Sequence, residues 1–274
     1  SNDYSLVYKK ADIIGRQCRT LGIHINFAPA IDINLNPANP VINTRSFGQN
    51  KWKVSLLSEQ YIKGLQDNGI MAVIKHFPGH GDTDLDSHLS LPTISHSKDF
   101  IDTVDLIPFK YNIEKGVWGA MIAHLNVPAL NKNHTYPASI NPDIIQGYLV
   151  DELGFEGLIF TDAMNMKGLT NDYPDGRAQV LALKAGVDIL LMPNNTDSAM
   201  NAILSAIENG ELSKELIKEK CRKVLNWKYK LGVMNPKHEP KPIRKKQKEE
   251  IGKHCEVIAP KILTLLENKD NINP

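Results

Sequence analysis

The chain has 274 residues, of which 42% are hydrophobic and 23% are charged, and its formal net charge is +1. These values are typical of a globular protein with a large core, and the small net charge argues against nucleic acid or an anionic membrane surface as a partner. No apolar run is long enough to span a bilayer, and three widely spaced cysteines indicate neither a disulfide framework nor a thiolate metal site.

Amphipathic segments and short apolar runs alternate along most of the chain, which predicts helices and buried strands. In chain order we expect a helix over Ser5–Leu21, a strand over Ile25–Ile33, a helix over Ser55–Asn68, a strand over Ala72–Phe77, a helix over Phe100–Lys115, a strand over Gly119–Val127, a helix over Pro142–Leu153, a strand over Gly157–Asp162, a helix over Arg177–Ala185, a strand over Val187–Met192, and helices over Ser198–Asn209 and Lys214–Leu231. Five glycines follow expected helix ends, where a left-handed residue is favoured: Gly22, Gly116, Gly154, Gly186 and Gly232.

The alternation of strands and helices predicts an α/β fold with a parallel sheet. The apolar strands lack in–out alternation, as expected where helices cover the outer face of a sheet. A complete (β/α)8 barrel has eight strands and about 250 residues, whereas five strands are evident here. We therefore expect a TIM-type barrel that lacks its first strands. On pattern alone, a doubly wound open sheet is the alternative.

The chain changes character near residue 235. Pro236–Pro242 is rich in proline and lysine and is expected to be an extended linker. A charged helix with a solvated face is expected over Arg244–Leu266. We therefore expect a barrel domain over residues 1–234, and over residues 235–274 a linker and helix that lead toward an additional C-terminal domain.

The most unusual segment is Lys75–Pro92, which follows an expected strand and begins with KHFPGHGDTDLDSH. Active sites of parallel barrels lie at the carboxyl ends of the strands, so we expect a functional loop here. Two chemistries are open. The His and Asp residues are potential ligands for a divalent ion, although their spacing is not that of a helical zinc pair. In the other interpretation, Asp86 orients His88 and raises its proton affinity, which makes a proton donor near neutral pH.

Other polar residues lie at or after the ends of expected strands. Asp162 ends a strand and is expected at the mouth of the barrel, with a turn or helix N-cap role as an equal alternative. Arg45 lies in a long loop, where it either folds inward onto sugar hydroxyls or a carboxylate or remains on the surface. His124 ends the third strand and either faces the same rim or is a buried core histidine. Asp32 either belongs to the site or anchors the loop of Arg45.

These residues together resemble glycoside hydrolase family 3, over about Tyr4–Gly232. The resemblance depends on four blocks in order, which are FAPAID at 27–32, RSFG at 45–48, KHFPGHGDT at 75–83 and FTD at 160–162. The DSH element at 86–88 is similar to the branch that acts on β-N-acetylglucosaminides, the NagZ-like enzymes. In this family, an earlier acidic loop ending in two glycines contacts the substrate, and the sequence contains no such loop.

The resemblance implies retaining hydrolysis of terminal β-linked N-acetylglucosamine from muropeptides or chitin-type oligosaccharides, without a metal or an organic cofactor. Peptidoglycan recycling is the expected context. The roles implied by position are nucleophile for Asp162, acid/base for His88 with Asp86 as its partner, sugar binding for Arg45, Lys75 and His76, and pocket lining for His124.

Several alternatives stay open. One is a β-glucosidase or β-xylosidase of the same family. Another is a β-N-acetylglucosaminide phosphorylase, because a neutral imidazole does not repel an incoming phosphate. The remaining two are a non-catalytic carbohydrate-binding barrel and a metallohydrolase. The sequence does not distinguish a cytoplasmic from a periplasmic or secreted location.

Overall fold

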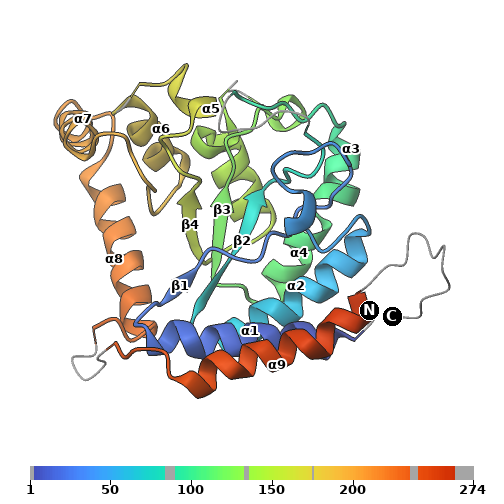
Figure 1. Ribbon diagram of the computed structural model, residues 1–274. Helices are drawn as coiled ribbons and strands as arrows, with labels where there is room; N and C mark the ends of the chain where they lie inside the picture. Colours follow the sequence, from blue (N-terminus) through green and yellow to red (C-terminus); the bar gives the residue numbers. More distant parts are fainter. Residues whose placement is uncertain (1–2, 84–89, 133–135, 175, 235–239, 263–274) are drawn as a thin grey trace.

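The computed structural model describes residues 3–83, 90–132, 136–174, 176–234 and 240–262, with side chains to residue 259. Figure 1 shows the strands side by side in the centre with their arrowheads toward the top. Helices α1 (Tyr4–Thr20) and α9 (Lys245–Ile262) cross beneath them. In the part of the chain that the structure describes, no helix is both long and apolar enough to cross a membrane.

Among the described residues, four parallel strands form the sheet, and their order follows the chain: β1 (Ile25–Asn26), β2 (Met71–Phe77), β3 (Gly119–Ile122) and β4 (Leu158–Thr161). An order without reversal is expected of a barrel, whereas a doubly wound sheet reverses direction at a switch point. The predicted α/β class and parallel sheet are therefore confirmed, and the described strands form one arc of a barrel.

The first and fifth predicted strands are less regular than expected. The first strand ends at Asn26, and parallel pairing returns only as a single bridge between Ala30 and Lys75. Pro29 lies in this interval and has no N–H to donate to a ladder. The fifth predicted strand is reduced to a bridge between Ile189 and Phe160.

Most helices lie close to their predicted positions. Their bounds, besides those of α1 and α9, are α2 (Lys51–Gln66), α3 (Lys98–Phe100), α4 (Ile107–Glu114), α5 (Lys167–Thr170), α6 (Arg177–Ala185), α7 (Thr196–Glu208) and α8 (Lys214–Lys230), with π-helical turns η2 (Ile101–Asp105) and η5 (Asp143–Glu152) and 3-10 turns η1 (Asn43–Arg45), η3 (Pro128–Leu130) and η4 (Ala138–Ile140). All five glycines predicted to follow helix ends have positive φ angles.

Two helix predictions differ from the structure for local reasons. The single helix expected over Phe100–Lys115 is divided into α3, η2 and α4, and Pro108 lies in the first turn of α4. A proline there has no N–H and its ring clashes with the preceding turn, so one continuous α-helix is interrupted. Helix α2 begins earlier than predicted because the Asn50 side chain caps it, accepting hydrogen bonds from the backbone N–H groups of Trp52 and Lys53.

Apolar side chains on the two faces of the sheet enter different clusters. Ala72 and Ile74 pack into the larger cluster with residues of α2, α4 and η5. Met71 and Val73 point to the other face, where they pack with Met121, Leu158, Phe160 and Leu231. We call this second surface the inner face, because a closed barrel would enclose it.

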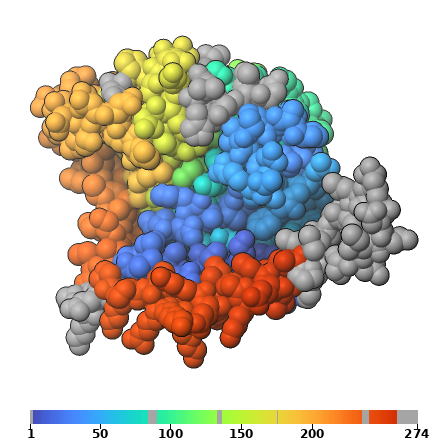
Figure 2. All heavy atoms as spheres, viewed as in Figure 1, coloured from blue at the N-terminus to red at the C-terminus, as the bar shows by residue number. Residues whose placement is uncertain are grey.

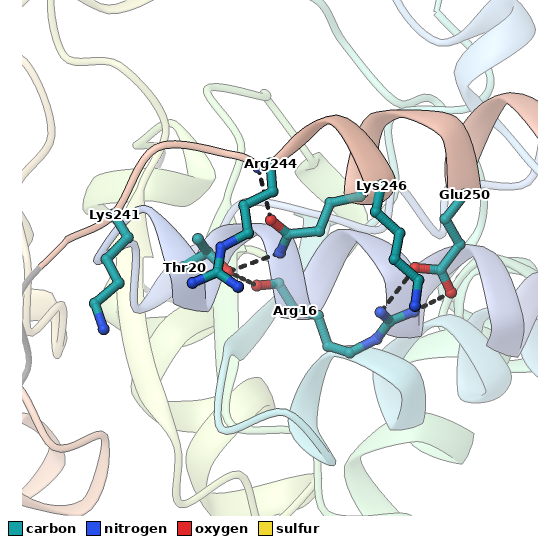
Figure 3. Close-up of a pocket in the computed structure, with 7 residues that line it drawn as sticks. Arg16, Thr20, Lys241, Arg244, Lys246 and Glu250 are labelled. Atoms are coloured by element: carbon teal, nitrogen blue, oxygen red, sulfur yellow. Dashed lines mark hydrogen bonds and ion pairs between the residues drawn. The ribbon is translucent and has the colours of Figure 1, made fainter.

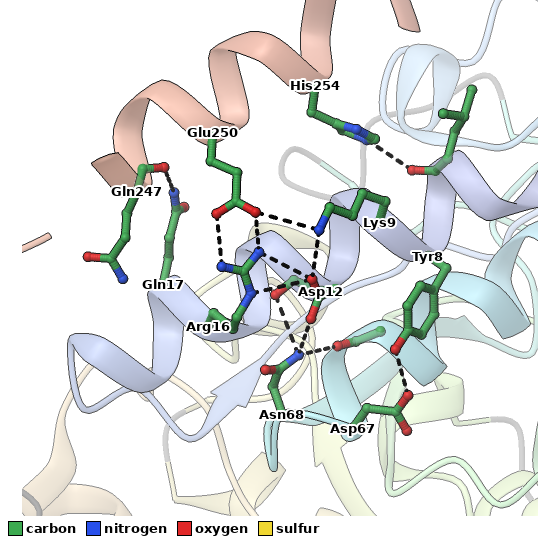
Figure 4. Close-up of polar contacts among 12 residues, drawn as sticks. Tyr8, Lys9, Asp12, Arg16, Gln17, Asp67, Asn68, Gln247, Glu250 and His254 are labelled. Atoms are coloured by element: carbon green, nitrogen blue, oxygen red, sulfur yellow. Dashed lines mark hydrogen bonds and ion pairs between the residues drawn. The ribbon is translucent and has the colours of Figure 1, made fainter. Parts of the chain in front are cut away.

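Helix α9 packs along α1 at the end of the molecule opposite the strand carboxyl ends (Figures 1 and 2). Arg16 of α1 donates two hydrogen bonds to the Glu250 carboxylate, at 2.6 and 2.8 Å (Figure 4). His254 contacts the Leu6 carbonyl oxygen at 3.0 Å. A cavity of about 330 Å³ lies between the two helices and is lined by Arg16, Thr20, Lys241, Arg244, Lys246, Gln247 and Glu250 (Figure 3).

Candidate active site

The carboxyl ends of β2, β3 and β4 bring together most of the predicted site residues that the structure describes. Lys75 and His76 belong to β2, and Asp162 directly follows β4. His124 follows β3. Arg45 reaches the same place from η1, in the long loop after β1. Asp86 and His88 lie outside the described residues, so their predicted acid/base role stays a prediction.

Two consecutive residues of β2, Lys75 and His76, both lie near Asp162. In a regular strand their side chains would point to opposite faces of the sheet. The pairing of β2 with β3 shifts register between Ile74 and Phe77. Phe77 consequently packs in the larger, outer cluster, while Lys75 and His76 both interact electrostatically with Asp162. The irregular register thus gives the site two neighbouring side chains from one strand.

Asp162 is placed by β4 and kept ionised by its neighbours. Its backbone N–H donates to the Ile122 carbonyl at 2.9 Å, which continues the pairing of β4 with β3. The Ala163 N–H donates to its carboxylate at 2.8 Å. Burial alone would raise the pKa of Asp162, but the surrounding donors and positive charge, among them the Ala163 N–H and Lys75, outweigh it and lower the pKa. A carboxylate of this kind is anionic at neutral pH, which is the form that a nucleophile requires.

Lys75 and Arg45 bring positive charge to the same region. Burial and the nearby guanidinium of Arg45 lower the pKa of Lys75, against the opposing effect of Asp162 and Asp32. Both cations line a cavity of about 410 Å³ together with the rings of Phe27 and Phe47, and this cavity adjoins Asp162 and His76, neither of which lines it, through Lys75 and Arg45. Cationic donors beside aromatic surface suit a polar ligand with apolar faces, such as a sugar.

His124 is fully buried. Its Nε2 lies 3.0 Å from the carbonyl oxygen of Ala163, and its Nδ1 lies 2.6 Å from the Ser139 hydroxyl. A carbonyl only accepts hydrogen bonds, so Nε2 carries the proton and donates it to that oxygen. His124 therefore supports the turn that follows Asp162, and its predicted contact with a ligand stays a prediction.

Asp32 connects the site residues that come from different loops. Its buried carboxylate accepts hydrogen bonds from the backbone N–H of His80 at 2.8 Å and of His76 at 3.1 Å. Its main-chain oxygen accepts from the Ser46 hydroxyl at 2.7 Å, next to Arg45. Burial opposes ionisation, but the contacts with His76 and His80 lower the pKa of Asp32 to about 2. The sequence left open whether Asp32 anchors the Arg45 loop, and the Ser46 contact does anchor it.

A second polar cluster was missed by the sequence analysis. His96 lies between two carboxylates, with Nε2 2.7 Å from Asp82 and Nδ1 2.7 Å from Asp105. Burial lowers the pKa of His96, but the two carboxylates outweigh it and raise the pKa. His96 lies in a loop and Asp105 at the end of η2, so no fixed spacing connects them. Within the described ranges, no group of three or more His, Cys, Asp or Glu side chains is arranged to hold a metal ion.

The family model and the related proteins that match this chain agree with one another. The model described as Glycosyl hydrolase family 3 N terminal domain matches residues 1–227. The chain is 37% identical over 242 residues to beta-hexosaminidase A of Pseudoalteromonas piscicida, with 81% of this chain and 40% of that protein covered. It is 31% identical over 235 residues to the beta-N-acetylglucosaminidase/beta-glucosidase of Cellulomonas fimi, with 83% and 42% covered.

Among solved structures, the chain is similar to a glycoside hydrolase family 3 beta-N-acetylglucosaminidase from Paenibacillus sp. str. FPU-7. The TM-score is 0.85 at 37% identity, over 93% of this chain and 50% of that one. This similarity confirms the predicted TIM-type barrel class. The chain spans half or less of the length of these three relatives.

Proposed function

The chain belongs to glycosyl hydrolase family 3, and from this premise we propose that it carries the catalytic centre of a retaining exo-β-N-acetylglucosaminidase. The proposed substrate is a glycan or muropeptide with a terminal β-linked N-acetylglucosamine. The observation that supports this most is the ionised Asp162 at the end of β4, beside Lys75 and His76. The names of the related proteins support the choice of sugar.

The proposed reaction has two steps, as in retaining glycosidases generally. In the first, a carboxylate oxygen of Asp162 bonds to the anomeric carbon as the bond to the leaving oxygen breaks. His88, oriented by Asp86, gives its proton to that oxygen. In the second step, water gives a proton to His88 and attacks the anomeric carbon, which releases Asp162 and the sugar.

The cations around Asp162 have a role beyond holding the carboxylate ionised. Arg45 and Lys75 are donors without acceptor capacity, so both suit the lone pairs of sugar hydroxyls. Held in place before the substrate arrives, such donors reduce the entropy lost on binding. We assign sugar-hydroxyl binding to Arg45, Lys75 and His76, and a supporting position behind Asp162 to His124.

A β-glucosidase is the second candidate, because the Cellulomonas fimi relative carries both activities in its name. Comparing kcat/KM of the purified protein on aryl β-N-acetylglucosaminide and on aryl β-glucoside separates the two candidates. A preference for the N-acetylated substrate supports the first proposal, and a preference for the glucoside supports the second. Turnover of neither, with binding of N-acetylglucosamine retained, would indicate a carbohydrate-binding barrel.

A further inference from the structure

We propose that Asp32 is a positioning residue that determines which ring nitrogen of His76 carries the proton, so that His76 presents a hydrogen-bond acceptor to the substrate. The consequence for substrate binding rests on the proposed function. The proton position itself does not, because it follows from contacts that are present before any substrate binds.

One contact that fixes the proton lies at Nδ1 of His76. The Asp32 carboxylate is 1% exposed, and its Oδ2 lies 2.8 Å from Nδ1 of His76. An ionised carboxylate can only accept hydrogen bonds. The same carboxylate also accepts from the backbone N–H groups of His76 and His80, so its orientation is fixed from three directions. Nδ1 of His76 therefore carries a proton.

A second contact lies at Nε2 of His76. Nη2 of Arg45 lies 3.3 Å from this nitrogen. Arginine is always protonated and has no acceptor, so Nε2 accepts and carries no proton. The contacts at the two ring nitrogens of His76 are thus both consistent with the neutral tautomer that has its proton on Nδ1.

This tautomer complements the other side chains that face the ligand. Arg45 and Lys75 can only donate hydrogen bonds, whereas a sugar hydroxyl must both accept and donate to be fully satisfied. Nε2 of His76, next to Arg45, can supply that acceptor. A sugar hydroxyl that takes the place of the direct contact between Arg45 and His76 can accept from Arg45 and donate to Nε2, which leaves no buried polar group unpaired. With the proton on Nε2, three donors would face the hydroxyl and its own proton would have no partner.

The proton position can be measured directly in the chain labelled with 15N-histidine, by two-dimensional NMR that correlates ring nitrogens with ring protons. We expect the Nε2 resonance of His76 to have the shift of an unprotonated nitrogen at neutral pH, and Nδ1 that of a protonated one. The His76→Gln variant assigns these signals by their loss. A wild-type spectrum with the proton on Nε2, or with both nitrogens protonated, would overturn the proposal without recourse to any further variant.

The Asp32→Asn variant tests the cause. The side-chain N–H₂ of asparagine donates where the Asp32 carboxylate accepts, so Nδ1 of His76 would become the acceptor. The ring proton of His76 is then expected to move to Nε2. We expect kcat/KM to fall about 10- to 100-fold, by analogy with the loss seen when a group that orients a metal-bound histidine is removed. Asp188→Asn is the matched control, because Asp188 is an equally buried carboxylate that pairs with Lys223 and Lys220 away from the site.

The outcomes separate the two proposals. An unchanged His76 tautomer in folded Asp32→Asn would overturn the positioning role. An equal loss of kcat/KM in Asp188→Asn would overturn it too, because the effect would then be one of general stability. If wild type has the expected tautomer but hydrolyses no N-acetylglucosaminide, the proposed function fails while the assignment of the proton by Asp32 stands.

Discussion

His96 and Asp82 are 14 residues apart in the sequence, yet Nε2 of His96 lies 2.7 Å from the Asp82 carboxylate. The same ring reaches Asp105 through Nδ1. The pair is notable for its place along the chain, because the segment between its members includes Asp86 and His88, the predicted acid/base residues. One contact thus joins the described chain on the two sides of residues 84–89.

This contact predicts a pH-dependent part of the stability. The carboxylates of Asp82 and Asp105 raise the pKa of His96 above its ordinary value of 6.5. A group whose pKa is raised on folding stabilises the native state fully below its unfolded pKa, and that stabilisation is lost as the pH rises through the folded pKa. We therefore expect the free energy of unfolding of wild type, measured relative to His96→Asn by denaturant titration, to decrease above pH 6.5.

The control for this series is His24→Asn, because His24 lies in the turn between α1 and β1, away from the carboxylates of Asp82 and Asp105. A difference between wild type and His96→Asn that stays constant from pH 6 to pH 9 (values chosen to span about two units above the ordinary histidine pKa) would contradict a charged His96 in the folded state.

The acid/base role of His88 predicts a dependence on the leaving group. General acid catalysis typically contributes about 10²- to 10⁴-fold when the leaving group needs a proton. We expect His88→Ala to lose activity in this range on an alkyl or sugar aglycone, and much less on an acidic phenol such as dinitrophenol. The measurement is kcat/KM across a series of aryl β-N-acetylglucosaminides of increasing phenol pKa. Equal losses across the series would assign His88 another role.

Gly81 is predicted to tolerate no side chain. A Cβ atom at this position would overlap the carbonyl oxygen of Ile33, which is backbone and cannot rotate away. Gly81→Ala should therefore destabilise the protein by about 1–3 kcal/mol or more, as overpacking does. Gly252→Ala is the matched control, because Gly252 lies in α9 with no atom near an added Cβ. It should be neutral or stabilising by up to about 1 kcal/mol. Equal effects of the two substitutions on thermal unfolding would refute the steric account.

The sequence was a good guide where local pattern determines structure. The apolar runs before Lys75 and Asp162 predicted buried strands, and the position of these residues at strand ends predicted that they would meet. The structure places Lys75 in β2 and Asp162 directly after β4, and it brings them close enough to interact. Helix α6 was predicted at its observed bounds, because Gly186 ends it with a left-handed turn.

The sequence was a poor guide where a tertiary contact or a backbone irregularity decides. Strict alternation would place Lys75 and His76 on opposite faces of the sheet, but the backbone of β2 is irregular between Ile74 and Phe77, where its register with β3 shifts. His96 and Asp105 form their contact across a loop and a helix, and no periodicity connects them. The buried acceptor role of Asp32 depends on two loops that meet only after folding.

Trapping the glycosyl-enzyme tests whether Asp162 forms a covalent bond to the sugar. The purified protein is incubated with a fluorinated N-acetylglucosaminyl fluoride, whose ring fluorine slows release of the sugar, and its peptides are analysed by mass spectrometry. We predict that the sugar is found on the peptide of Asp162 in wild type and in the Asp188→Asn control. Asp162→Asn should carry no label and lose roughly 10⁴-fold or more in kcat/KM, as expected when a catalytic nucleophile is removed. A label on another residue, or near wild-type turnover by Asp162→Asn, would contradict the assignment of Asp162 as the nucleophile.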